Sequence, residues 1–131
     1  MSYSTRIGAY GVLIHDQKVL LIRKEGGPFA SLWDLPGGGI EFSETPAEAF
    51  HRELREEAAL TAHCIELFTT LSTHGATYHF VGIVYRVHGH APIPDLLPED
   101  EGHWFPLSTL DPAVLTPFAR QALSELDKKM D

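Results

Sequence analysis

The chain has 131 residues, of which 44% are hydrophobic and 21% charged, the size and composition of one globular domain spanning residues 1–131. Its formal net charge of −8 argues against binding nucleic acid polymers and would repel an anionic substrate unless bound cations intervene. The single cysteine, Cys64, excludes an intrachain disulfide, and no apolar run approaches the roughly 20 residues of a membrane-spanning helix.

The first part of the chain predicts strands joined by turns. Two apolar runs, 7–15 and 18–23, flank the turn residues 16–17 and therefore predict a β-hairpin. After a glycine-containing loop, the extended piece 32–36 ends at a proline and leads into a predicted glycine turn at 37–39.

Three signals for the start of a helix coincide after the glycines. Thr45 suits the N-cap, Pro46 the first helical position, and Glu48 completes a capping box, so the sequence predicts a helix from Pro46 to about Ala58. Its apolar stripe consists of Ala47, Phe50, Leu54 and Ala58.

Three glutamates of this helix stand beside that stripe. Glu53, Glu56 and Glu57 are spaced i, i+3 and i+4, which places their carboxylates within an arc of about 100°. Like charges at this spacing repel one another, and a hard divalent cation would offset the repulsion. Arg52, placed on the solvated side, lies four residues before Glu56 and is expected to orient it. The alternative is an ordinary exposed helix with alternating charges.

The second half of the chain predicts further strands and a last helix. Apolar patterns indicate strands at 62–71 and 77–87, the second of which is central because both of its faces are apolar. A proline-rich loop at 88–100 precedes a strand at 101–106. The helix that Thr116 caps carries an apolar face of Ala119, Ala122, Leu123, Leu126 and Met130.

The pattern of residues 38–60 resembles the Nudix box: Gly38, Glu44, the run Arg52-Glu53-Leu54-Arg55-Glu56-Glu57, and then Ala59-Leu60. The lead-in at 33–36 and the later Glu101-x-x-Trp104 are also similar to the family pattern. The resemblance implies an α/β fold, an α/β/α sandwich with a mixed central sheet.

Two positions depart from the family pattern. Ala59 stands where the box usually has a glycine that ends the helix, and Ser43 stands where many members have glycine. Alanine in a left-handed conformation would cost about 1 kcal/mol or shift the end of the helix.

The resemblance also implies an activity, the hydrolysis of a nucleoside diphosphate linked to another group. Water attacks a phosphorus atom, with Mg²⁺ or Mn²⁺ as cofactor. The resemblance assigns the metal ligands to Glu53, Glu56, Glu57 and the backbone carbonyl of Gly37 or Gly38.

The resemblance also implies roles for residues that do not bind the metal. Glu44 would orient Arg52 or a water molecule beyond the ligands, and Arg52 would orient Glu56. Arg52 is also predicted to be a catalytic residue. The general base is Glu56 or Glu101, with Glu99 and Asp100 close enough to Glu101 to compete. Arg23, Gly38 and Tyr78 are expected to contact substrate, although Arg23 would equally suit a solvated strand end and Tyr78 the core.

The substrate is expected to be a small nucleotide. Tyr78 resembles the tyrosine of dinucleoside polyphosphate hydrolases, which keeps that activity open. A second class is a catalytically inactive nucleotide-sensing domain, because a fold does not fix a function. No secretory signal is recognised in residues 1–6, so the sequence predicts a cytoplasmic protein without membrane partners, for which a homodimer is one compatible assembly.

Overall fold

The computed structural model describes residues 2–129, which form ten strands, two α-helices and two short 3₁₀ turns. The strands are β1 Ser4–Val12, β2 Ile14–His15, β3 Lys18–Arg23, β4 Trp33–Asp34, β5 Gly37–Gly39, β6 Leu60–Ala62, β7 Ile65–His74, β8 Tyr78–Val87, β9 His90–Pro92 and β10 Gly102–Pro106. The helices are α1 Pro46–Ala58 and α2 Pro117–Lys129, and the 3₁₀ turns are Leu107–Thr109 and Pro112–Val114. Met130 lies outside the described residues.

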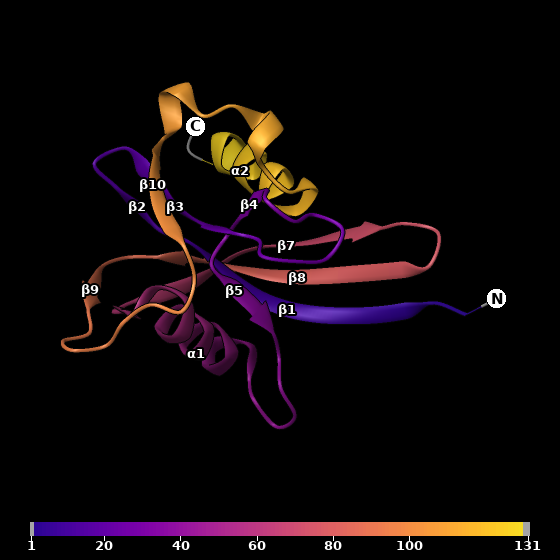
Figure 1. Cartoon of the computed structure of the whole chain (residues 1–131), viewed down its shortest axis with the longest axis horizontal. Coiled ribbons are helices and arrows are strands. Elements are labelled where there is room, and N and C mark those ends of the chain that lie inside the picture. The colour runs from indigo at the N-terminus through magenta and orange to yellow at the C-terminus, as the bar shows by residue number, and fades with distance from the viewer. Residues whose placement is uncertain (1, 130–131) are drawn as a thin grey trace.

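The strands form a mixed sheet in the order β5-β1-β8-β7, in which β1 and β8 are parallel and the other pairs antiparallel. Helices α1 and α2 lie on opposite sides of this sheet (Figure 1). A second sheet has the order β10-β3-β2, with β4 also paired to β3. The predicted α/β fold with a mixed sheet and helices on both faces is thus confirmed. Within residues 2–129, neither helix has the length and apolarity needed to cross a bilayer.

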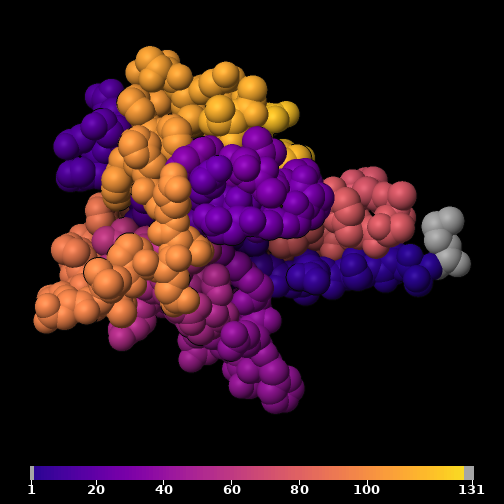
Figure 2. Space-filling view, viewed as in Figure 1, coloured from indigo at the N-terminus to yellow at the C-terminus, as the bar shows by residue number. Residues whose placement is uncertain are grey.

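The two helices cover separate hydrophobic clusters because β1 alternates its side chains between the two faces of the sheet. Ala9 packs with Phe50 and Leu54 on the α1 side, whereas Tyr10 packs with Phe118 on the α2 side. Figure 2 shows that the N-terminal ends of β1 and β8 project beyond the rest of the molecule.

Four predicted boundaries are wrong. The strand predicted at 7–15 is divided at Leu13 into β1, which pairs with β8 and β5, and β2, which forms the hairpin with β3. The strand predicted at 62–71 is divided at His63-Cys64 into β6 and β7, because β6 turns away to pair with β9. The loop predicted at 88–100 therefore contains the short strand β9. The predicted glycine turn at 37–39 is strand β5, which pairs with β1. Each difference depends on a partner strand that is distant in the sequence, which local pattern cannot reveal.

Both ends of α1 follow the residue types at them. At the start, the Thr45 hydroxyl accepts a hydrogen bond from the Glu48 N–H at 3.1 Å, and the Glu48 carboxylate accepts one from the Thr45 N–H at 2.8 Å. At the end, Ala59 adopts the left-handed conformation with φ of 55° and donates its N–H to the Arg55 carbonyl. The helix therefore ends where the family pattern puts the glycine, and the alanine takes the strained conformation.

We expect Ala59→Gly to change stability only slightly. Relief of the left-handed alanine would gain about 1–2 kcal/mol. Against this, the buried methyl group, on a residue only 6% exposed, contributes about 0.8 kcal/mol. The more flexible unfolded chain costs a further 0.4–1 kcal/mol or so. Urea unfolding should therefore place the variant within about 1 kcal/mol of the parent, by this sum.

Ala58→Gly is the matched control, because the neighbouring Ala58 lies inside the helix. It should lose about 1 kcal/mol. A loss of about 1.2–1.8 kcal/mol in Ala59→Gly, which is the sum without relief of strain, would contradict the left-handed conformation of Ala59.

Candidate functional site

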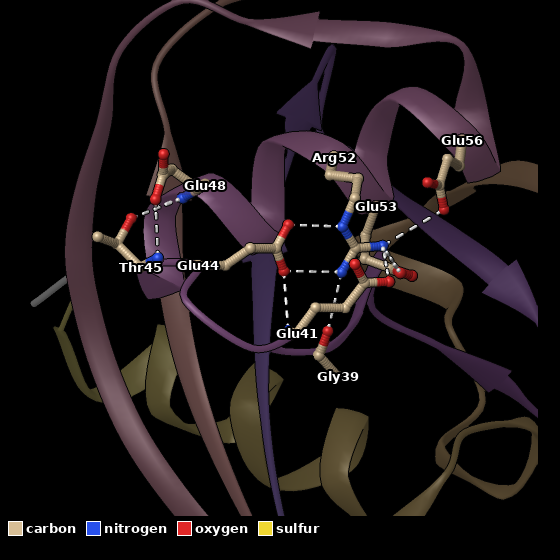
Figure 3. A network of polar contacts seen from close by, with 8 residues as sticks. All are labelled: Gly39, Glu41, Glu44, Thr45, Glu48, Arg52, Glu53 and Glu56. Atoms are coloured by element: carbon tan, nitrogen blue, oxygen red, sulfur yellow. Dashed lines mark hydrogen bonds and ion pairs between the residues drawn. The ribbon is translucent and has the colours of Figure 1, made fainter.

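Arg52 is the centre of a polar network that joins α1 to the loop before it (Figure 3). Its Nε and Nη2 atoms donate to the two oxygens of Glu44 at 2.7 and 3.0 Å, and Nη1 donates to Glu53 at 2.6 Å. Nη2 also donates to the Gly39 carbonyl at 3.0 Å, and Glu56 accepts from Nη1 at 3.4 Å. The predicted contacts of Arg52 with Glu44 and Glu56 are present. However, its side chain is only 22% exposed, so its assignment to the solvated side was wrong.

The electrostatics of this network keep both main partners charged. The hydrogen bond from Arg52 lowers the pKa of Glu44, and the Glu41 N–H donates to Glu44 as well. The same contact raises the pKa of Arg52 above its usual value. A fork of two parallel hydrogen bonds fixes the guanidinium plane, so Arg52 presents Nη1 to Glu53 in one orientation.

Strand β5 needs glycine because it lies between a glutamate of α1 and the backbone of β1. A Cβ atom on Gly38 would collide with the Glu53 carboxylate. The Gly37 N–H donates to Glu57 Oε1 at 2.8 Å. Gly37 also has a φ of 142°, and a Cβ atom there would collide with the Ala9 carbonyl. Gly38 thus allows the Glu53 carboxylate to approach the main chain, and Gly37 allows β5 to lie close against β1.

Acidic side chains are concentrated where α1 meets β5. Burial raises the pKa of Glu57 to about 9, and repulsion from Glu53, Asp100 and Asp34 acts in the same direction against the hydrogen bond from Gly37. Burial likewise raises the pKa of Glu53. Acids brought together in this way favour a bound cation, which would stabilise their ionised forms.

The donor chemistry of the site fits a hard divalent cation. The available groups are the carboxylates of Glu53, Glu56 and Glu57 and the backbone carbonyl of Gly37, all of them oxygen donors. Among residues 2–129, no three His, Cys, Asp or Glu side chains already converge on one point. Glu56 is directed toward Arg52 and is 45% exposed, so this carboxylate would have to reorient to act as a ligand.

A small cavity of about 120 Å³ opens beside Glu57. Its wall includes the predicted Arg23 together with Lys24, Gly37 and Asp100. The sequence named Asp100 only as a neighbour of Glu101, because the register of three consecutive acids at 99–101 cannot be read from their pattern.

Glu101 itself is placed differently. Its carboxylate lies 3.6 Å from the Arg23 guanidinium and is 57% exposed. Its backbone carbonyl accepts the Arg23 N–H at 2.9 Å, next to the pairing of β10 with β3.

A larger cavity of about 490 Å³ adjoins the first and shares Tyr10, Lys24 and Asp34 with it. The predicted Tyr78 lies in its wall, with further aromatic and basic residues. The aromatic members are Phe29, Phe80 and Phe118, and the second basic one is Arg6. Trp104 of the family pattern is not part of this wall and packs against His90.

Asp34 is a buried acid between the two cavities. Its Oδ1 accepts the Leu35 N–H at 2.8 Å and the Thr116 hydroxyl at 3.0 Å. Burial raises the pKa of Asp34, and these two hydrogen bonds only partly oppose the effect. The carboxyl therefore joins β4 to the start of α2, with its charged form disfavoured by the fold.

We expect Asp34→Asn to stabilise the protein in alkaline but not in acidic solution. The folded state holds the Asp34 proton more tightly than the unfolded state, so stability is lost as pH rises from the ordinary aspartate range through the raised pKa. Asparagine keeps the accepting oxygen and does not titrate. Thermal unfolding should give nearly equal midpoints for parent and variant at pH 4 and a higher midpoint for the variant at pH 8.

Asp111→Asn is the control, because Asp111 accepts a similar backbone hydrogen bond at an exposed turn. A difference between parent and Asp34→Asn that does not vary with pH would contradict the expectation.

The chain is similar to known proteins both in sequence and in structure. The family model described as NUDIX domain matches residues 5–126. An 8-oxo-dGTP diphosphatase from Haemophilus influenzae is 32% identical over 101 residues, 77% of this chain and 74% of that protein. An ADP-ribose pyrophosphatase from Methanocaldococcus jannaschii is 35% identical over 77 residues, 57% of this chain, which spans only 46% of that relative. The crystal structure of a MutT NUDIX hydrolase from Burkholderia pseudomallei superposes with a TM-score of 0.83 and 29% identity, covering 93% of this chain and 98% of that one.

Proposed function

Because this chain belongs to the NUDIX family, we propose that it cleaves a pyrophosphate bond in a nucleoside di- or triphosphate derivative by attack of water on phosphorus. One observation carries the proposal. Two glutamates of α1, Glu53 and Glu57, are held against the glycine backbone of β5 beside a cavity that contains both acidic and basic side chains.

Glu53, Glu56, Glu57 and the Gly37 carbonyl are the groups that would hold Mg²⁺, with Mn²⁺ as a substitute. When bound, the metal supplies neutralisation of the charge on the transferring phosphoryl group. The protein's own part is to fix the donors. Arg52, clamped by Glu44, holds the Glu53 carboxylate, and the Gly37 N–H holds that of Glu57.

The basic residues of the small cavity suit the phosphate chain. Arg23 is the last residue of β3 and Lys24 follows it, and both lie in the wall of the cavity with Glu57 and Asp100. A guanidinium binds phosphate oxygens through paired hydrogen bonds, and an ammonium binds them as a point charge. Arg23 would have to exchange its exposed ion pair with Glu101 for the phosphate, which is a small cost for a pair of this kind.

Asp100 is our candidate for the general base that activates the water. It lines the cavity and lies close enough to Glu53 and Glu57 to repel their charges. Glu56 and Glu101 are the competing candidates. The carboxylate of Glu56 is engaged by Arg52, and that of Glu101 by Arg23.

The larger cavity suits the nucleoside. Its aromatic side chains could stack on a base. Tyr10, Lys24 and Asp34 line both this cavity and the small cavity beside Glu57, so the two adjoin. A bound nucleotide would thus place its base near Tyr78 and Phe80 and its phosphates near Glu57. The named activities of the relatives supply the compounds to test.

The test is a hydrolysis assay with product identification on 8-oxo-dGTP, ADP-ribose, the ordinary nucleoside triphosphates and a dinucleoside polyphosphate. We expect turnover of at least one compound with Mg²⁺ and none after chelation by EDTA. Turnover of the dinucleoside compound alone would favour that narrower activity. Tight binding of a nucleotide without hydrolysis would instead favour a nucleotide-sensing domain and overturn the enzymatic proposal.

A further inference from the structure

The segment that carries Asp100, residues 93–101, is attached to the end of α1 through its backbone. The N–H groups of Ile93, Glu99 and Asp100 donate to the carbonyls of residues 59, 56 and 57 at 2.9, 2.9 and 3.3 Å. Carbonyls in the last turn of a helix have no partner within the helix, so the segment satisfies them. The position of Asp100 is therefore tied to the helix that carries Glu56 and Glu57.

Apart from these bonds, the segment is held at its last residue, where the Glu101 carbonyl accepts the Arg23 N–H and the Glu101 carboxylate pairs with the Arg23 guanidinium. Most of its side chains are exposed, and it contains Pro94, Pro98 and Asp95, the last with a φ of 63°. The preceding strand β9 pairs with β6 over only three residues. A segment with few buried contacts opens at low free-energy cost unless its ends are fixed.

Its ends continue into paired strands, β9 with β6 and β10 with β3, and two stacked rings join β9 to β10. His90 in β9 and Trp104 in β10 have ring centroids 5.2 Å apart and planes inclined by 29°. His15 in β2 contacts both rings edge-on, at centroid distances of 5.8 and 6.3 Å. Trp104 also packs against the hydrophobic cluster beneath α1. The stack thus connects the strands on either side of residues 93–101, and Trp104 connects them to the hydrophobic cluster beneath α1.

The His90 ring stacks in its neutral form. Burial lowers the pKa of His90, and repulsion from the nearby His15 and His63 lowers it further. At pH 7 the ring is therefore uncharged, and its contact with Trp104 is an aromatic stack between neutral rings.

We propose that His90 is a positioning residue whose stack on Trp104 holds residues 93–101 against the end of α1 and so places Asp100 at the site. The anchoring is a property of the fold alone. Its catalytic consequence rests on the proposed function, and the two parts are tested by different measurements.

The anchoring is tested by backbone hydrogen exchange, followed by NMR in metal-free protein. In His90→Ala we expect the amides of Glu99 and Asp100 to exchange about 2- to 10-fold faster, the factor that corresponds to one aromatic pair. His90→Phe, which keeps a ring, should exchange like the parent. Amides in the middle of β8 should be unchanged in every variant.

His74→Ala is the matched control, because His74 forms a ring pair with His79 at 6.4 Å, in strands distant from this segment. It should leave the exchange of Glu99 and Asp100 unaltered. Equal protection in His90→Ala and the parent would overturn the proposal. Faster exchange in β8 as well as in the segment would also overturn it, by showing a general loss of stability.

The catalytic consequence is tested with the substrate found in the hydrolysis panel. His90→Ala should lower kcat about 2- to 10-fold, by the same factor, and leave KM within about 2-fold of the parent. In an Asp100→Asn background it should have no further effect, because its action passes through Asp100. Additive effects of the two substitutions would overturn this part. If the parent hydrolyses nothing, the proposed function fails, while the exchange experiment still decides the anchoring.

Discussion

Replacement of Glu57 by glutamine is expected to reduce hydrolysis at least about 100-fold, the upper end of the cost of losing even an outer partner of a metal ligand. The substitution removes the charge of the side chain but keeps its hydrogen bond. The new side chain would keep a carbonyl oxygen to accept the Gly37 N–H, now at 2.8 Å, but would lack the negative charge for a cation. The fold should survive, because burial already disfavours the charged form of Glu57 in metal-free protein. The rate should be measured with saturating Mg²⁺ and nucleotide, and Mn²⁺ affinity by calorimetry.

Glu48→Gln is the control, with the same chemical change on the same helix. Glutamine also completes a capping box, so this variant should retain full activity, metal affinity and stability. Full activity in Glu57→Gln would remove the carboxylate from the mechanism. If Glu57→Gln lowered the melting temperature well below that of the parent as well as reducing activity, the loss of activity would instead reflect damage to the fold.

The sequence was sufficient to predict the parts of this site that depend on local spacing. The capping box at Thr45 and Glu48, the extent of α1 and the adjacent glutamates follow from the 3.6-residue period and from hydrogen bonds between residues three apart. The hairpin turn at Asp16 and Gln17 is equally local, and both residues adopt positive φ, as a tight two-residue turn requires.

The remaining features depend on contacts between distant parts of the chain. The fork between Arg52 and Glu44 spans eight residues and withdraws from solvent a side chain that helical geometry alone assigned to the exposed side. The pairing of β5 with β1 converts an apparent glycine turn into a strand and explains why Gly37 has no side chain, whereas Gly38 makes room for the Glu53 carboxylate of α1. Periodicity carries no information about such partners.

The choice among the acids at 99–101 is the clearest case. In the sequence the three are equivalent, and Glu101 is favoured only by its distance from Trp104. In the structure, residues 99 and 100 donate backbone hydrogen bonds to the end of α1, and Asp100 lines the same cavity as Glu57. Glu101 lies just before β10 and forms an ion pair with Arg23. One residue of register thus separates a cavity-lining acid from an exposed ion pair.

This difference predicts the largest contrast between neighbouring substitutions in the protein. Asp100→Asn is expected to lower kcat about 10²- to 10⁴-fold, the contribution of a general base. Glu101→Gln should lower it by less than about 5-fold, because an exposed ion pair contributes at most about 1 kcal/mol. Both variants keep the size of the side chain and the backbone hydrogen bonds of the segment. Single-turnover kinetics with saturating Mg²⁺ would isolate the chemical step.

Glu56→Gln completes the comparison and separates a metal ligand from a base. If Glu56 serves only as a ligand, its loss should weaken Mg²⁺ binding, and raising the Mg²⁺ concentration should restore most of the rate, whereas the rate of Asp100→Asn should not recover. A loss in Glu56→Gln that persists at every Mg²⁺ concentration would transfer the role of base to Glu56. A severe loss in Glu101→Gln with a mild one in Asp100→Asn would transfer it to Glu101, and would require the segment 93–101 to shift by one residue when the nucleotide binds.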